Sequence, residues 1–224
     1  MIFGIYNQLT LESSVYGGDI MQNRSSKTLY LTELALLLAI VIIMTVTNIG
    51  NIPIGPIVAT IYQVPIIIGA VILGPKAGSF LGGAWGLLCF FLAAMGQTTD
   101  VVALMIVQHN IFAYLLIAFV PRLLTGLLAG LLFQFLKGRL SGKKDILVFG
   151  ITGAVGAFCN TILYLGALYL FVRPLVANAL NISQAVVGGI VLTTAFTNGL
   201  VEAALACILV TAICKALKAA KVFY

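Results

Sequence analysis

The chain has 224 residues, of which 62% are hydrophobic and only 8% are charged. Soluble domains carry about 25% charged residues, so this composition excludes a water-soluble protein and predicts an all-α membrane protein. The formal net charge of +6 therefore does not indicate a nucleic-acid partner. The four cysteines lie in apolar segments without the spacing of a metal or redox site, so we expect buried, inert thiols, no metal and no cofactor.

The N-terminal segment differs from the rest of the chain. Its first twenty residues include no basic residue and too few apolar ones for a secretory signal or a membrane span. We expect residues 1–24 to be a disordered N-terminal tail and residues 25–224 to form a single membrane domain.

Hydrophobic segments follow at regular intervals and predict a bundle of six transmembrane helices. They cover residues 29–47, 58–73, 77–95, 118–136, 146–171 and 186–217. The second segment, of roughly 16 residues, gives about 24 Å of helix, which is shorter than the hydrocarbon core of about 30 Å. It also contains Pro65 and ends at Gly74-Pro75. Transporters build substrate sites from interrupted helices of this kind, so the segment predicts a solute-binding membrane protein.

Basic residues are distributed unevenly between the two sides of the predicted bundle. One side collects ten of the twelve Lys and Arg residues, namely Arg24, Lys27, Lys76, Lys137, Arg139, Lys143, Lys144, Lys215, Lys218 and Lys221. Arg122 and Arg173 belong to the other side. Because cytoplasmic loops are enriched in Lys and Arg, both termini are expected to lie in the cytoplasm.

Two of the predicted outer connections are unusual. Residues 48–56 are rich in Pro, Gly and Asn, which is typical of a shaped loop and favours a lid. Residues 96–117 form a connection much longer than the usual length of about 2–8 residues between bundle helices, and long loops are frequently functional. A seventh, interfacial helix is the alternative for this connection. Asn51 and Gln97 are the candidate ligand-binding residues from these two loops.

Two charged residues occur in or beside predicted membrane spans, where charge is costly. Pro is favoured in the first turn of a helix, so Pro121 is expected to place Arg122 at the N-terminus of the fourth span. Free backbone N–H groups and a guanidinium there would favour an anion such as a carboxylate. Alternatively, Arg122 extends to the lipid headgroups. Glu202 in the sixth span is a second candidate, unless it pairs with Arg122 or hydrogen-bonds between helices.

Other polar side chains recur at helical spacing on the last two spans. Asn198 and Glu202 are four residues apart, as are Asn160 and Tyr164, so each pair shares one helix face. Buried amide and carboxyl groups need partners in hydrocarbon, and a polar ligand could supply them. Hydrogen bonds between helices are the alternative for each of these residues.

Small residues at four-residue spacing predict close contacts between helices. They are Ala35 and Ala39 in the first span, Gly78, Gly82 and Gly86 in the third, and Gly126 and Gly130 in the fourth. Alanine pairs at this spacing are common in membrane helices, so the glycines carry most of this prediction.

Several short motifs, taken in order, make the chain similar to one family. They are Ala35-x-x-x-Ala39, Pro53-Ile54-Gly55-Pro56, Leu73-Gly74-Pro75-Lys76-Ala77-Gly78, Pro121-Arg122, Asn160-Thr161 and Asn198-Gly199-Leu200-Val201-Glu202. Over residues 25–220 the chain resembles the substrate-binding S component of an energy-coupling factor (ECF) vitamin transporter. It is most similar to the pantothenate type, and the hydroxymethylpyrimidine and riboflavin types are the alternatives.

The resemblance implies a transporter subunit of the bacterial cytoplasmic membrane and not an enzyme. Such a subunit binds a vitamin under its first, third and fifth outer loops and releases it inside by toppling against a transmembrane coupling subunit. Two separate cytoplasmic subunits hydrolyse ATP, and this chain has no phosphate-binding loop of its own. The resemblance also implies that Ala35 and Ala39 contact the coupling subunit.

Pantothenate would suit the candidate residues chemically. Its carboxylate calls for a cation such as Arg122. Its hydroxyl and amide groups call for polar partners, for which the candidates are Asn160, Tyr164, Asn198 and Glu202. A different class of protein stays open, namely a stand-alone secondary transporter coupled to protons through Glu202, although the chain shows no internal repeat of the kind typical of such carriers.

Overall fold

The computed structural model describes residues 27–54, 57–98, 100–140, 145–181 and 183–220. The predicted tail, residues 1–24, lies outside the described residues. The chain divides into two compact units, Met1–Leu36 and Leu37–Tyr224, and the elements discussed below belong to the second unit apart from the first ten residues of the helix Lys27–Thr47.

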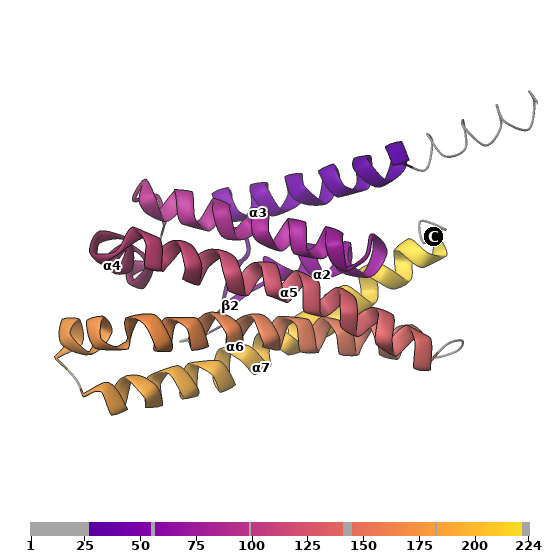
Figure 1. Ribbon diagram of the computed structural model, residues 1–224. Helices are drawn as coiled ribbons and strands as arrows, with labels where there is room; N and C mark the ends of the chain where they lie inside the picture. Colours follow the sequence, from indigo (N-terminus) through magenta and orange to yellow (C-terminus); the bar gives the residue numbers. More distant parts are fainter. Residues whose placement is uncertain (1–26, 55–56, 99, 141–144, 182, 221–224) are drawn as a thin grey trace, which may run out of the picture. The chain divides into compact units, whose positions relative to one another are not determined.

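The described part of the chain is mostly helical (Figure 1). Its helices are Lys27–Thr47, α2 Gln63–Ile72, α3 Pro75–Ala94, α4 Val101–His109, α5 Ile111–Arg139, α6 Asp145–Leu180 and α7 Gln184–Ala219. Among the described residues, five helices are long and apolar enough to cross a membrane: Lys27–Thr47, α3, α5, α6 and α7. The prediction of a helical membrane protein is thus confirmed, whereas the predicted number of six spans is not.

The second predicted span, residues 58–73, is wrong in its first part. Strand β1, Asn51–Ile54, pairs antiparallel with strand β2, Ile57–Thr60, so a hairpin replaces the expected start of the helix. The physical reason is local, because β2 is rich in β-branched residues and directly follows Gly55-Pro56, which disfavours a continuous helix. Helix α2 has only 10 residues, about 15 Å of helix, and is too short to cross the membrane.

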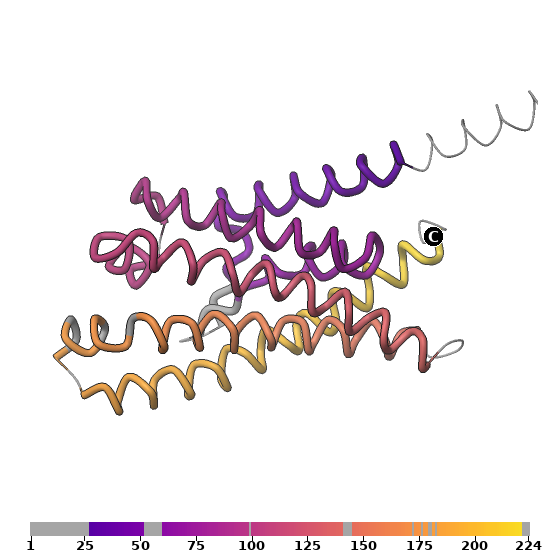
Figure 2. The backbone as a smooth tube through the Cα atoms, in the orientation of Figure 1, coloured from indigo at the N-terminus to yellow at the C-terminus, as the bar shows by residue number. Residues whose placement is uncertain are grey.

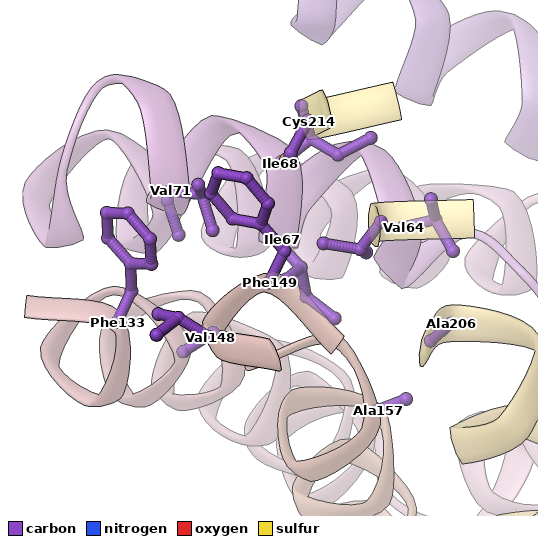
Figure 3. Close-up of a cluster of buried hydrophobic side chains, with 13 residues drawn as sticks. Val64, Ile67, Ile68, Val71, Phe133, Val148, Phe149, Ala157, Ala206 and Cys214 are labelled. Atoms are coloured by element: carbon purple, nitrogen blue, oxygen red, sulfur yellow. The ribbon is translucent and has the colours of Figure 1, made fainter. Parts of the chain in front are cut away.

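Helix α2 is instead the buried centre of the unit Leu37–Tyr224. Nine of its ten residues are buried, including Pro65, which lies in the first turn and therefore breaks no helical hydrogen bond. Figure 3 shows the side chains that surround it, contributed by α5, α6 and α7. They include Phe133 and Phe149, whose rings stack with their centres 5.9 Å apart. This complete burial explains why α2 is apolar on every face.

The start of the fourth predicted span is also wrong. The long connection contains α4, as in the alternative of a seventh helix, and α5 begins at Ile111. The side chain of Asn110 sets this start, because its Oδ1 accepts hydrogen bonds from the backbone N–H groups of Phe112 and Ala113, each at 3.1 Å. Pro121 therefore lies inside α5 and does not open it. A proline within a membrane helix gives up one backbone hydrogen bond, which neighbouring groups in the bundle can compensate.

Helices α3 and α5 pack closely through the predicted glycines. A Cβ atom at Gly82 would overlap the carbonyl oxygen of Arg122, and one at Gly126 would overlap that of Gly78. At Gly86 it would lie 2.7 Å from the carbonyl oxygen of Ala118. The prediction of close helix contacts for the third and fourth spans is confirmed, and these contacts place α3 directly against the part of α5 that carries Arg122.

The second unit has two distinct ends. An ion pair between Lys218 and Asp145 joins the end of α7 to the start of α6. Figure 2 shows these helix termini near the end of α5, whereas α4 and the connection between α6 and α7 lie at the opposite end. The first of these ends also carries Lys137 and Arg139 in the last turn of α5. The cytoplasmic location of this end and of both termini stays a prediction.

Candidate ligand-binding cavity

A cavity of about 290 Å³ lies within the unit Leu37–Tyr224. All seven candidate ligand-binding residues line it, namely Asn51, Gln97, Arg122, Asn160, Tyr164, Asn198 and Glu202. They come from β1, the connection between α3 and α4, α5, α6 and α7. The fold thus brings together residues that are up to about 150 positions apart in the sequence.

Arg122 lies in this cavity between two aromatic rings. Its guanidinium carbon is 4.6 Å from the centre of the Trp85 ring and 5.0 Å from that of Tyr164. Its Nη1 donates a hydrogen bond of 2.8 Å to the carbonyl oxygen of Ala118, one turn earlier in α5. Its Nε is buried and has no hydrogen-bond partner in the described part of the chain. Arg122 therefore faces the interior of the unit, and the alternative in which it extends to the headgroups does not hold.

The glycines of α3 explain how Trp85 reaches Arg122. Because Gly82 lies directly against the backbone of Arg122, the residue one turn further along α3 faces the guanidinium. Trp85 is only 4% exposed, and its Nε1, like Nε of Arg122, is buried without a hydrogen-bond partner among the described residues. Two neighbouring residues of the cavity wall thus each have a buried N–H group without a hydrogen-bond partner among the described residues, namely Nε of Arg122 and Nε1 of Trp85. A buried donor that is left without a partner costs about 1–3 kcal/mol of folding free energy.

Glu202, in contrast, accepts three hydrogen bonds from protein donors. Its Oε1 accepts from the backbone N–H of Thr60 at 2.9 Å and from the Thr60 hydroxyl at 2.6 Å. Its Oε2 accepts from the hydroxyl of Thr161 on α6 at 2.7 Å. No ion pair between Glu202 and Arg122 occurs among the residues described, so the predicted alternative of such a pair is wrong.

A second carboxylate at the cavity is also held by the protein. Asp100 caps α4 with Oδ1, which accepts from the N–H of Ala103 at 3.1 Å. Its Oδ2 accepts from the hydroxyl of Tyr164 on α6 at 3.2 Å. Tyr164 therefore links the connection between α3 and α4 to the guanidinium of Arg122. This hydrogen bond lies at an exposed position, unlike those of Glu202.

The other predicted residues have more modest contacts. Asn160 accepts a hydrogen bond of 3.3 Å from the hydroxyl of Thr125 on α5, and Asn198 accepts one of 3.4 Å from the hydroxyl of Thr197. Asn51 is the β1 partner of Thr60 in the hairpin. Each of these residues lines the cavity.

Several lining residues were not predicted. The most important are Trp85, Thr60 and Thr161, together with Cys89, which was expected to be buried and inert. Trp85 did carry a signal, because it is the single tryptophan and stands between two of the spaced glycines. Thr60 carried none, since its role depends on the unexpected hairpin. Of the described parts of the outer connections, those before β1 and after α3 line the cavity, and the connection between α6 and α7 does not.

The charges of the cavity favour an anionic or strongly polar ligand. Both carboxylates accept hydrogen bonds from protein groups, whereas the cation has no carboxylate partner among the described residues. A buried guanidinium is most stable opposite an anion, and a carboxylate matches its geometry. Helices able to span a membrane thus surround a polar cavity suited to a small solute.

Comparison with known proteins identifies the family. The model of the family described as ECF transporter, substrate-specific component, matches residues 29–214. The chain is 32% identical over 209 residues to the pantothenic acid transporter PanT of Lactococcus lactis subsp. cremoris, covering 88% of this chain and 98% of that protein. It is 31% identical over 144 residues to the pantothenate transporter PanT of Leuconostoc mesenteroides subsp. mesenteroides, covering 62% and 67%.

The chain therefore belongs to the family of ECF transporter substrate-specific components. This confirms the resemblance found in the sequence. It also establishes a multi-pass membrane protein that functions in transport and not as an enzyme.

Proposed function

We propose that this chain is the pantothenate-binding S component of an ATP-driven ECF importer in a bacterial cytoplasmic membrane. The observation that carries the proposal is the position of Arg122, a half-buried cation with a buried Nε and no carboxylate partner among the described residues, at the wall of a polar cavity. The names of both PanT relatives support pantothenate as the ligand. The cavity of about 290 Å³ is at the small end of ligand pockets, which suits a vitamin of this size.

In the proposed complex the carboxylate of pantothenate binds Arg122, and the aromatic rings of Trp85 and Tyr164 hold the guanidinium in place. The hydroxyl and amide groups of the vitamin bind other polar side chains of the cavity. Their proposed partners are Asn51, Gln97, Asn160, Tyr164, Asn198 and Glu202. Hydrogen bonds between a guanidinium and a carboxylate are charge-assisted and therefore stronger than those between neutral groups.

The transport cycle that we propose needs three partner subunits. Ligand binds from the outer side, and the chain then topples against a transmembrane coupling subunit, while two cytoplasmic subunits hydrolyse ATP. Ala35 and Ala39 are the proposed contact with the coupling subunit, and both are exposed. Small exposed residues on a membrane helix permit close approach of a partner helix.

The ligand is tested by mass spectrometry of small molecules released from the gently purified protein, followed by titration with the compound found. We expect stoichiometric pantothenate. Hydroxymethylpyrimidine or riboflavin in its place would overturn the choice of vitamin. No bound vitamin, together with uptake by the chain alone in proteoliposomes, would overturn the S-component mechanism in favour of a secondary transporter.

The contact with the coupling subunit is tested by Ala39→Trp. The bulky ring should prevent assembly with the coupling subunit and abolish uptake, while pantothenate binding by the isolated chain stays normal. Ala94→Trp is a matched control, because Ala94 is an exposed alanine at the end of α3, away from the proposed contact. Normal assembly of the Ala39→Trp protein would contradict the proposed interface.

A further inference from the structure

The carboxylate of Glu202 joins three separate elements. It lies on α7 and is only 6% exposed. One oxygen accepts two hydrogen bonds from Thr60 of β2, and the other accepts one from Thr161 of α6. Residues 60 and 202 are far apart in the sequence, so this contact is a tertiary connection between the hairpin and the helices.

We propose that Glu202 is a positioning residue that clamps the hairpin β1–β2 against α6 and α7 at the cavity, and that this clamp controls the rate of ligand release. The inference rests on the proposed function, since it assigns a role in binding to a residue of that cavity. It differs from a simple ligand contact, because the principal partner of the carboxylate is the hairpin itself.

The hairpin needs such a clamp. Each of its strands has four residues, and an isolated two-stranded hairpin is at best marginally stable. Its other firm attachment is at the residues that flank it, where Gly50 lies directly against the ring of Tyr62 and accepts the N–H of Ile61 at 2.9 Å. Tyr62 in turn stacks near Trp85 with the ring centres 5.8 Å apart. Glu202 therefore supplies the hydrogen bonds by which α7 holds β2.

The clamp is placed where it can affect a ligand. Thr60 pairs with Asn51 across the hairpin, and both residues line the cavity. Release of Thr60 from Glu202 would free the strand pair that forms this part of the wall. A ligand would then leave faster, although Arg122, which lies on α5, would still be present to bind it.

The carboxylate of Glu202 has one acceptor position left, through which a bound ligand could strengthen the clamp. A carboxylate has about four lone-pair positions, and the protein donors in this structure occupy three of them. The remaining position on Oε2 could accept one hydroxyl or amide of a bound ligand. Binding would then complete the hydrogen bonding of Glu202 and further stabilise the hairpin, which couples occupancy of the cavity to closure of this wall.

The clamp is tested first without any ligand, by amide hydrogen exchange of residues 51–60 in the full chain. Thr60→Val removes the hydroxyl donor but keeps the β-branched shape, so we expect exchange in the hairpin to become about tenfold faster. Thr60→Ser keeps the donor and should restore slow exchange. Thr211→Val is the matched control on α7, because the Thr211 hydroxyl bonds only the carbonyl of Cys207 in its own helix, at 2.6 Å.

The same variants are then compared in pantothenate binding. Thr60→Val should raise the dissociation rate about tenfold with little change in the association rate, and Thr60→Ser should reverse the effect. The double variant Thr60→Val with Glu202→Gln should dissociate hardly faster than the worse single variant, because both changes remove parts of one contact.

Two results would overturn the clamp. One is hairpin exchange in Thr60→Val as slow as in the wild type. The other is faster dissociation in Glu202→Gln with no effect of Thr60→Val, which would make Glu202 a ligand contact only. A wild-type protein that does not bind pantothenate would refute the proposed function instead, and the hydrogen exchange of the ligand-free protein would still decide whether the clamp exists.

Discussion

The two charged walls of the cavity are built in opposite ways. At one wall, Arg122 is stacked between two aromatic rings and has no carboxylate partner in the described structure. At the other, Glu202 accepts three hydrogen bonds from two threonines. In a small cavity of low dielectric, opposite charges would be expected to pair. In this cavity the carboxylate of Glu202 accepts hydrogen bonds from protein groups, whereas the guanidinium of Arg122 has no carboxylate partner among the described residues.

This difference separates two functions that the sequence alone could not distinguish. A half-buried guanidinium without a carboxylate partner gains a favourable contact when an anion binds, so in the proposed function the Arg122 wall is the part that supplies affinity. A satisfied carboxylate supplies geometry, since its contacts hold the hairpin to the helices. Four substitutions test this division, in order of decreasing expected effect.

The largest effect is expected for Gly82→Ala, which would disrupt the packing of α3 against the part of α5 that carries Arg122. The added methyl group overlaps the carbonyl oxygen of Arg122, so α3 must move away from α5. We expect a loss of about 3 kcal/mol in stability and a lower melting temperature in detergent. Gly83→Ala is the matched control, because the nearest atoms to its Cβ would be side-chain atoms, namely the ring of Phe119 at 3.2 Å and Leu123 at 3.6 Å. Equal melting temperatures for both variants would show that the close contact is unimportant.

Arg122→Ala removes the cation but leaves the helix packing intact. Loss of a charge-assisted contact of about 1.5–3 kcal/mol should weaken pantothenate binding at least tenfold, as measured by calorimetry. The control is Arg173→Ala on α6, since Arg173 bonds Tyr169 at 2.9 Å and does not line the cavity. A folded Arg122→Ala protein with normal affinity would assign the ligand to another part of the cavity.

Trp85→Phe keeps an aromatic ring beside Arg122 and removes the indole donor. Because a cation–π contact contributes about 0.5–2 kcal/mol and the smaller ring retains part of it, we expect affinity for pantothenate to fall about three- to tenfold. Binding is followed by calorimetry, with Trp85→Leu expected to lose more. The role of Trp85 beside Arg122 would be contradicted if Trp85→Phe and Trp85→Leu lowered the affinity for pantothenate equally and Arg122→Ala did not change it.

The smallest effect is expected for Tyr164→Phe. The ring below the guanidinium stays, and only the exposed hydrogen bond of 3.2 Å to Asp100 is lost. Affinity should fall about two- to fivefold. Asp100→Asn provides an independent measurement of the same contact, and the two single effects should not add in the double variant. Additive effects would mean that Tyr164 and Asp100 act separately.

Helical periodicity was sufficient to predict much of the cavity. Asn160 with Tyr164, and Asn198 with Glu202, lie one turn apart, so each pair had to face the same side once its helix formed. The spaced glycines likewise predicted close helix contacts for the third and fourth spans, although not that these two helices pack on each other. In these cases the local pattern alone determines the outcome.

The features that were missed depend on competing local signals or on distant contacts. Residues 57–60 are mostly apolar and mostly β-branched, which suits a strand as well as the start of a membrane helix. At the start of α5, the cap formed by Asn110 outweighs the signal of Pro121. The partners of Thr60 and Trp85 come from other elements, so no sequence window around either residue could reveal them.

The most direct test of the central claim compares pantothenate with pantothenol, in which a hydroxymethyl group replaces the carboxylate. Both compounds are titrated into the purified wild-type protein by calorimetry. If Arg122 binds the carboxylate, pantothenate should bind at least about tenfold more tightly than pantothenol. Equal affinities for the two compounds would contradict the account, because the unpaired cation would then contribute nothing to recognition.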